Sequence, residues 1–164
     1  MSNPSVALLM GSKSDLPKLQ SCLDTLQKLG LQAEVRIMSA HRTPEIVSEF
    51  ASTAAARGLK VIIAAAGGAA HLAGVVAAHT MLPVIGIPVE GGSLNGMDAL
   101  LATVQMPGGI PVATVGVGSG GPVNAALLAA QIIAVADADL RARLVADRQV
   151  RKEKVLAADK ELNP

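Results

Sequence analysis

Aromatic residues are almost absent from this 164-residue sequence, which contains one phenylalanine, Phe50, and no tryptophan or tyrosine. A planar ligand therefore cannot be held by the aromatic stacking on which single-stranded nucleic acids usually bind. Backbone groups and small aliphatic side chains would have to hold such a ligand instead. The formal net charge of +1 gives no sign of a nucleic-acid partner or of an acidic membrane surface as partner.

Cysteine is also scarce, because Cys22 is the only one in the chain and cannot form an internal disulfide. It lies within a helical pattern, where we expect it to be a small buried hydrophobe. No basic segment followed by an apolar one opens the chain, so we expect a cytoplasmic location. The length predicts one domain over 1–164, with 137–162 as a C-terminal helical extension.

Charged residues are missing from two long stretches, 61–89 and 99–136. Runs of this length raise the question of transmembrane helices. Glycines and prolines cut both runs into pieces of strand or short-helix length, so we predict no membrane span. A parallel sheet buried on both faces accounts for them better, because its strands read as continuous apolar runs. The covering helices are uncharged too, which predicts that other subunits of a homo-oligomer cover them.

Five strands, each followed by a helical pattern, are predicted along the chain. The strands are expected at 6–10, 32–38, 60–65, 83–87 and 112–115, and the helices at 16–29, 44–57, from 71, 98–105, 123–136 and within 137–162. This order predicts an α/β fold: a three-layer αβα sandwich of flavodoxin-like type with parallel strand order 2-1-3-4-5. The last helix is expected to be amphipathic and to lie across the body or a neighbouring subunit. The loops after the first three strands then meet at one edge, where ligands bind in open α/β sheets.

The first of these loops, Gly11-Ser-Lys-Ser-Asp15, predicts an anion site. A glycine followed by serines at a strand-to-helix turn presents backbone N–H groups and hydroxyls at a helix N-terminus. The spacing to Lys13 does not fit a Walker loop. The alternative interpretation is that Ser14 or Asp15 only caps the helix.

The second loop, Ser39-Ala-His-Arg-Thr-Pro44, places a histidine beside an arginine. Histidine can give and take a proton near neutral pH, and arginine offers a planar fork of donors to a phosphate or carboxylate. The alternative is an ordinary helix start with Thr43 as N-cap and Pro44 at the first helical position. That alternative leaves His41 and Arg42 unexplained.

The third loop, Gly67-Gly-Ala-Ala-His-Leu72, combines small residues with a second titratable group. Small residues let the backbone approach a ligand closely. The alternative is that the glycines only allow tight helix-to-sheet packing and that His71 caps the helix. His79, later in that helix, is expected at the surface or at an interface.

A further glycine pattern, Gly116-Val-Gly-Ser-Gly-Gly121, matches the dinucleotide fingerprint G-x-G-x-x-G. That fingerprint belongs to the first βαβ unit and needs an acidic residue at the end of the following strand. Here the pattern follows the last predicted strand. We therefore interpret it as, at most, a flexible loop that faces a ligand.

The three loops and two later segments together resemble the class I family of 5-(carboxyamino)imidazole ribonucleotide mutases of purine biosynthesis. The matching segments are Met10-Gly-Ser-Lys-Ser-Asp15, Ser39-Ala-His-Arg-Thr-Pro44, Gly67-Gly-Ala-Ala-His-Leu72, Val104-Gln-Met-Pro-Gly-Gly-Ile-Pro111 and Asn124-Ala-Ala-Leu-Leu-Ala-Ala130. The class II aminoimidazole ribonucleotide carboxylases, which use free carbon dioxide, more often carry lysine after the histidine and lack the third segment.

This resemblance implies an isomerase that moves a carboxylate from the exocyclic nitrogen of an aminoimidazole ribonucleotide to ring atom C4, without metal or organic cofactor. His41 would protonate the carbamate nitrogen, release carbon dioxide beside the ring, and then take up the C4 proton. The substrate-binding positions would be Ser12, Ser14, Asp15, Ser39, Arg42, Gly67, Gly68, Ala69, Ala70 and His71. The resemblance also implies a homo-octamer and a transient contact with the upstream carboxylating synthetase.

The sequence departs from the family pattern at a few positions. Ala65 and Ala73 stand where the family often has Gly and Pro, and the 116–121 loop lacks the lysine usually found there. These departures bear on rate more than on reaction type. Two alternatives stay open: the class II carboxylase reaction with free carbon dioxide, and a non-catalytic flavodoxin-like ligand-binding module.

Overall fold

The computed structural model describes residues 4–163, and its five strands form one parallel sheet in the order β2-β1-β3-β4-β5. The strands are β1 (Val6–Met10), β2 (Ala33–Ile37), β3 (Val61–Ala66), β4 (Val84–Pro88) and β5 (Ala113–Thr114). Every neighbouring pair runs parallel, with Val6 of β1 level with Ala33 of β2 and Val61 of β3. The predicted fold class and strand order are confirmed.

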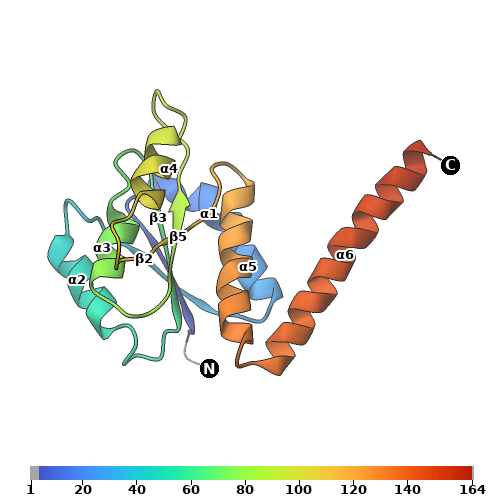
Figure 1. Ribbon diagram of the computed structural model, residues 1–164, viewed down its shortest axis with the longest axis horizontal. Helices are drawn as coiled ribbons and strands as arrows, with labels where there is room; N and C mark the ends of the chain where they lie inside the picture. Colours follow the sequence, from blue (N-terminus) through green and yellow to red (C-terminus); the bar gives the residue numbers. More distant parts are fainter. Residues whose placement is uncertain (1–3, 164) are drawn as a thin grey trace.

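Helices cover both faces of this sheet (Figure 1). They are η1 (Lys13–Asp15), α1 (Leu16–Lys28), α2 (Pro44–Thr53), α3 (Leu72–Ala78), α4 (Met97–Val104), α5 (Gly120–Ala134) and α6 (Ala138–Leu162), η1 being a single 3₁₀ turn. Helices α1 and α5 pack on one face, whereas α2 and α3 pack on the other with α4 beside them. The result is the predicted three-layer arrangement.

The core is divided by the sheet into two clusters. Leu8 and Met10 of β1 point into the cluster under α1 and α5, while Ala7 and Leu9 point into the cluster under α2 and α3. Both sides of β1 are therefore buried, which explains its uninterrupted apolar sequence. Cys22 is also fully buried, and burial raises the pKa of its thiol to about 12, as expected for an inert core cysteine.

Several predicted boundaries were wrong. Helix α2 ends at Thr53 rather than at residue 57, because the chain turns at 54–58 to bury Leu59. Helix α5 begins at Gly120 rather than at residue 123, so the last two residues of the glycine-rich 116–121 loop are helical. Strand β5 has only two residues, at 113–114, and pairs with β4 alone.

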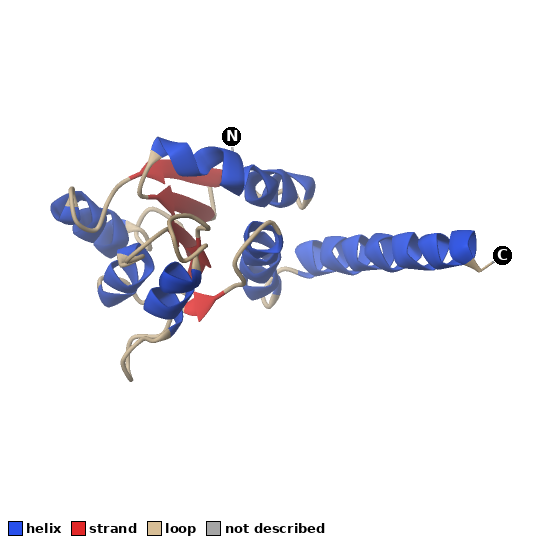
Figure 2. Ribbon diagram, turned by 90° about the horizontal axis from the view of Figure 1, so that it is seen from above, coloured by secondary structure: helices blue, strands red, loops and turns tan. Residues whose placement is uncertain are grey.

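The two halves of α6 lie in different surroundings (Figure 2). In the first half, the Arg141 guanidinium donates to the carbonyl of Ala134 at the end of α5, and Arg143 donates to the carbonyl of Leu29 at the end of α1. Residues 148–162 are exposed and extend away from the sheet. The expectation that this helix lies across the body holds only for its first half. None of the helices in residues 4–163 is long and apolar enough to cross a membrane.

Candidate active site

The loops after β1, β2 and β3 enclose a cavity of about 500 Å³ at the carboxyl edge of the sheet. Its lining consists of Gly11, Ser12, Asp15, Ser39, Ala40, His41, Arg42, Ala66, Gly67, Ala70, His71 and Leu72. The convergence predicted from the strand order is thus present. Three of the predicted residues, Ser14, Gly68 and Ala69, belong to these loops but do not line the cavity.

A pair of histidines joins two of the loops. Nε2 of His41 lies 2.7 Å from Nδ1 of His71, and the two rings meet edge to face with centroids 4.8 Å apart. At this distance one nitrogen carries the hydrogen and the other accepts it. A neutral pair then has one bare nitrogen and one N–H at its outer ends, so it can take a proton at one end and give one at the other. This is the property that acid and base catalysis requires.

Arg42 ties the β2 loop to the β1 loop. Its Nη2 donates to the carbonyl of Gly11 over 2.7 Å, and its Nε donates to Oγ of Ser39 over 3.5 Å. A guanidinium has five N–H groups, so three remain for another acceptor. A fork that is held on one side and free on the other suits a phosphate or a carboxylate.

The helical turn that follows β1 is capped by Ser12 and not by Ser14 or Asp15, the two residues considered from the sequence. Oγ of Ser12 accepts the backbone N–H of Ser14 over 3.3 Å and lies 2.8 Å from the Ser14 hydroxyl, so Ser12 is the N-cap of η1. Asp15 occupies the N-cap position of α1 but makes no side-chain cap bond. Asp15 also lines the cavity.

The β3 loop needs unusual backbone conformations. Gly68 and Ala70 both have positive φ, +61° and +43°, and Ala70 is only 4% exposed. A Cβ on Gly67 would lie 3.2 Å from the carbonyl oxygen of Val89, so a glycine fits there best. His71 stands at the N-cap position of α3 without a side-chain cap bond. Its ring bonds to His41 instead, so the interpretation of His71 as a helix cap is wrong.

Thr43 occupies the predicted N-cap position of α2, with Pro44 at the first helical position. Its side chain makes no cap bond to α2 and turns back to Ser39. Sequence reasoning missed this contact and the Gly11 carbonyl that holds Arg42. The four-residue spacing between Ser39 and Thr43 was a usable signal, because a threonine hydroxyl can bond to nearby backbone groups.

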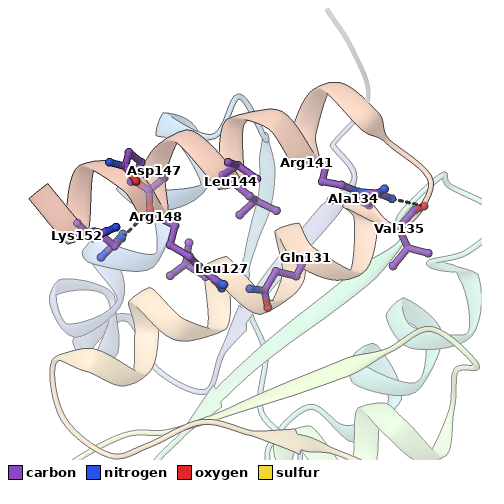
Figure 3. Close-up of a pocket in the computed structure, with 12 residues that line it drawn as sticks. Leu127, Gln131, Ala134, Val135, Arg141, Leu144, Asp147, Arg148 and Lys152 are labelled. Atoms are coloured by element: carbon purple, nitrogen blue, oxygen red, sulfur yellow. Dashed lines mark hydrogen bonds and ion pairs between the residues drawn. The ribbon is translucent and has the colours of Figure 1, made fainter.

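A second cavity, of about 620 Å³, lies between α5 and α6 (Figure 3). Leu127 and Gln131 of α5 face Leu144 and Arg148 of α6 across it. Its one carboxylate, Asp147, is occupied: hydrogen bonds from Lys28 and Arg151 hold the pKa of that carboxyl below its usual range. We interpret these ion pairs as structural contacts, of which the one with Lys28 holds α6 against α1.

Other titratable side chains do not form a comparable group. His79 is exposed, as expected, and its Nδ1 lies 3.4 Å from the Ser48 hydroxyl. It stands at the C-terminal end of α3, whereas His71 stands at the N-terminal end. Across residues 4–163, no three His, Cys, Asp or Glu side chains are placed to hold a metal ion. The His41 cavity is therefore the candidate active site.

Comparison with known proteins identifies the family of this chain. The family profile described as AIR carboxylase matches residues 5–154. Two curated relatives named N5-carboxyaminoimidazole ribonucleotide mutase, from Bacillus subtilis and Vibrio vulnificus, are 52% and 51% identical over 97% and 93% of this chain and 98% and 94% of their own lengths. The crystal structure of Treponema denticola PurE superposes with a TM-score of 0.87 at 31% identity, covering 98% of this chain and 99% of that one.

Proposed function

This chain belongs to the AIR carboxylase family, and we propose that it is an isomerase, an N5-carboxyaminoimidazole ribonucleotide mutase of purine biosynthesis. Relatives of that name in several bacteria are about half identical to it over nearly their whole length. The structural observation that carries the proposal is the hydrogen-bonded pair of His41 and His71 beside the half-free guanidinium of Arg42. Proton transfer next to an anion-binding fork is what this reaction needs.

In the proposed reaction His41 acts first as an acid and then as a base. It protonates the exocyclic carbamate nitrogen; the bond between nitrogen and the carboxyl carbon breaks, its electron pair stays on nitrogen, and carbon dioxide is released beside the ring. Ring atom C4 then attacks that carbon dioxide, and His41 takes up the C4 proton. The proton balance closes within one turnover, so a single histidine serves both steps. Carbon dioxide held next to C4 gives the second step its effective concentration.

The remaining lining residues have roles that fit their placement. The three free N–H groups of Arg42 and the Ser12 hydroxyl would bind the phosphate, and Ser14, which does not line the cavity, would support Ser12 through the contact between their hydroxyls. The uncapped carboxylate of Asp15 would accept the ribose hydroxyls. The carboxylate and carbon dioxide would lie against Ser39 and the backbone of 67–70, and His71 would set the charge around them through its bond to His41.

We extend the proposal to the assembly. The 99–136 region has no charged residue, and the outer face of α4 exposes Met97, Leu101 and Val104 at helical spacing. Helix α6 exposes further apolar residues in its distal half, such as Val155 and Leu162. Surfaces of this kind support a homo-oligomer, which we propose to be an octamer.

Other parts of the proposal come from the sequence. They are a single domain over 1–164 with the 137–162 extension, a cytoplasmic location, catalysis without metal or organic cofactor, and a transient contact with the carboxylating synthetase. One sheet that carries both core clusters supports the single domain. The others stay predictions.

The test is the ultraviolet-monitored conversion of freshly made carbamate substrate, with neither bicarbonate nor ATP added. Because the chain has no tryptophan or tyrosine, the protein contributes little absorbance. We expect conversion above an enzyme-free blank. Substrate labelled with carbon-13 in the carboxylate should keep its label in the product when unlabelled bicarbonate is present.

The other outcomes would contradict the proposal in distinct ways. Activity only on aminoimidazole ribonucleotide with bicarbonate would make the protein a carboxylase that uses free carbon dioxide. Inactivity in both assays, with binding of the nucleotide retained, would favour a non-catalytic binding module.

A further inference from the structure

The hydroxyl of Thr43 closes the turn that carries His41 and Arg42. Its Oγ1 accepts the backbone N–H of Ser39 over 2.9 Å and donates to the Ser39 carbonyl over 3.2 Å. The Thr43 N–H donates to the same carbonyl over 2.9 Å. Three hydrogen bonds therefore join the first and last residues of the turn, and two of them belong to one hydroxyl.

The interior of the turn is held by Ser39 in the same way. Oγ of Ser39 accepts the backbone N–H of His41 and that of Arg42, each over 3.3 Å. From this turn the His41 ring reaches His71, and the Arg42 guanidinium reaches the Gly11 carbonyl. The side chains proposed to do the chemistry thus depend on Ser39, and Ser39 depends on Thr43.

Thr43 takes this role in place of the one expected from its position. A threonine at an N-cap normally accepts an N–H from the first turn of its helix. Here Thr43 has φ −139° and ψ 52° at the N-cap of α2, and its side chain makes no cap bond. Pro44 at the first helical position has no N–H to satisfy. The Thr43 hydroxyl therefore makes both of its hydrogen bonds to the backbone of Ser39, and the N-terminus of α2 has no side-chain cap.

We propose that Thr43 is a positioning residue for the reaction, which fixes Ser39 and through it aims His41 and Arg42 into the cavity. This inference rests on the proposed function. It assigns no contact between Thr43 and the substrate, since Thr43 does not line the cavity. Its effect is transmitted through the backbone of the turn.

The test compares three variants in the mutase assay. Thr43→Val keeps the shape but removes both hydroxyl bonds, and a misplaced catalytic group costs on the order of 100-fold in rate. We expect kcat to fall and KM to rise together, because the side chains of His41 and Arg42 depend on the same turn and are both displaced when it changes. Thr43→Ser keeps the hydroxyl and should restore most of both parameters. Thr53→Val removes a hydroxyl that bonds to the Glu49 carbonyl near the other end of α2, and should behave as the unmodified chain.

A second readout does not depend on activity. The chain has three histidines, so carbon-13 labelling at Cε1 gives three ring signals in the assembled protein. In Thr43→Val, at fixed pH, we expect the His41 and His71 signals to shift and the His79 signal to stay. In Thr43→Ser both should return. If the unmodified chain proves inactive, the proposed function fails, and the histidine signals still decide whether Thr43 positions the pair.

Two results would overturn the inference. One is a folded Thr43→Val whose kinetic constants and histidine signals match those of the unmodified chain. The other is a Thr43→Ser as impaired as Thr43→Val, which would assign the effect to packing of the methyl group. Circular dichroism and thermal melting of each variant separate both results from a failure to fold.

Discussion

The carboxyl edge of the sheet carries two loop clusters of different construction. Around β1, β2 and β3, side chains bond to side chains and to the backbone of neighbouring loops, as in the pair of His41 and His71. Around β4 and β5, a cavity of about 460 Å³ lies beside Gly118 and Ser119. There the Lys18 ammonium donates to the backbone carbonyl of Glu90. Only the first cluster brings titratable side chains into contact with one another.

Two glycines of the second cluster, Gly118 and Gly121, have structural causes. Gly118 has φ +86°, a conformation that favours glycine. A Cβ on Gly121 would overlap the carbonyl oxygen of Gly116, because α5 begins directly against the loop. Two of the three glycines in the G-x-G-x-x-G pattern are thus explained by the turn into α5, whereas a Cβ on Gly116 would meet no atom within 4 Å. A glycine motif indicates where the backbone is tight, whereas chemistry requires placed side chains.

The strongest test of the difference between the two loop clusters is a substitution of His41. In His41→Asn the acid and base is lost, and we expect turnover to fall on the order of 10³-fold while folding and assembly are unchanged. The matched control is His79→Asn, which removes an exposed histidine outside the cavity and should keep normal turnover. Initial rates from the absorbance assay, with size-exclusion chromatography of both variants, provide the measurement. Near-normal turnover of His41→Asn would contradict the assignment.

Arg42 tests whether the first cluster also binds the anionic part of the substrate. Arg42→Ala removes the fork and its bond to Gly11, so we expect kcat/KM to fall by about 10- to 100-fold, mainly through KM. Arg36→Ala is the control, since it removes a cation from β2 that pairs with Glu34 outside the cavity. An equal rise of KM in both variants would point to a general loss of positive charge.

Much of the first cluster could be predicted from sequence, because it depends on topology. Strand β1 was located to the residue, since an apolar run bounded by Ser5 and Gly11 leaves little freedom. Once the strand order was assigned, the loops containing His41 and His71 had to meet at one edge. Those two steps needed only pattern and chain connectivity.

The details that were missed depend on competition between contacts. Thr43 suits a helix cap and a turn equally well by sequence, and only the placement of Ser39 decides between them. Helix α2 continues by propensity to residue 57, but burial of Leu59 ends it earlier. The distal half of α6 has few contacts within its own chain, so its direction follows from the anchored half alone. Local sequence does not encode such choices.

The second cluster can be tested at its tightest glycine. Gly121→Ala places a methyl group against the Gly116 carbonyl, and relief of that overlap should cost about 1–3 kcal/mol of unfolding free energy. The control is Gly120→Ala, because a Cβ there would meet no atom within 4 Å. Denaturant unfolding at fixed protein concentration gives the difference. If KM for the substrate rose tenfold in Gly121→Ala at unchanged stability, the second cluster would belong to the active site.

A substitution on α6, outside both loop clusters, should have the smallest effect on stability and activity. Asp147 is buried on α6 and bonds to Lys28 of α1 and Arg151 of α6. The Lys28 and Arg151 side chains are 59% and 48% exposed, so solvent screens the pairs, and we expect Asp147→Asn to lose only about 1 kcal/mol. At pH 7, kcat/KM should be unchanged. Asp159→Asn, in the exposed half of α6, is the control.

The pH dependence of the Asp147 contact has a definite sign. The pKa of Asp147 is lowered in the folded protein, so its contribution is fully present above the unfolded value of about 3.9 and is lost as pH falls through the folded value. Unfolding free energies of the unmodified chain and Asp147→Asn should therefore differ by a constant amount from pH 7 down to about pH 4 and approach each other only as the pH falls further. Curves that stay parallel over that lower range would show that the contact does not stabilise the fold. A drop of kcat/KM in Asp147→Asn would show instead that the contact between α6 and α1 influences the loop cluster that contains His41.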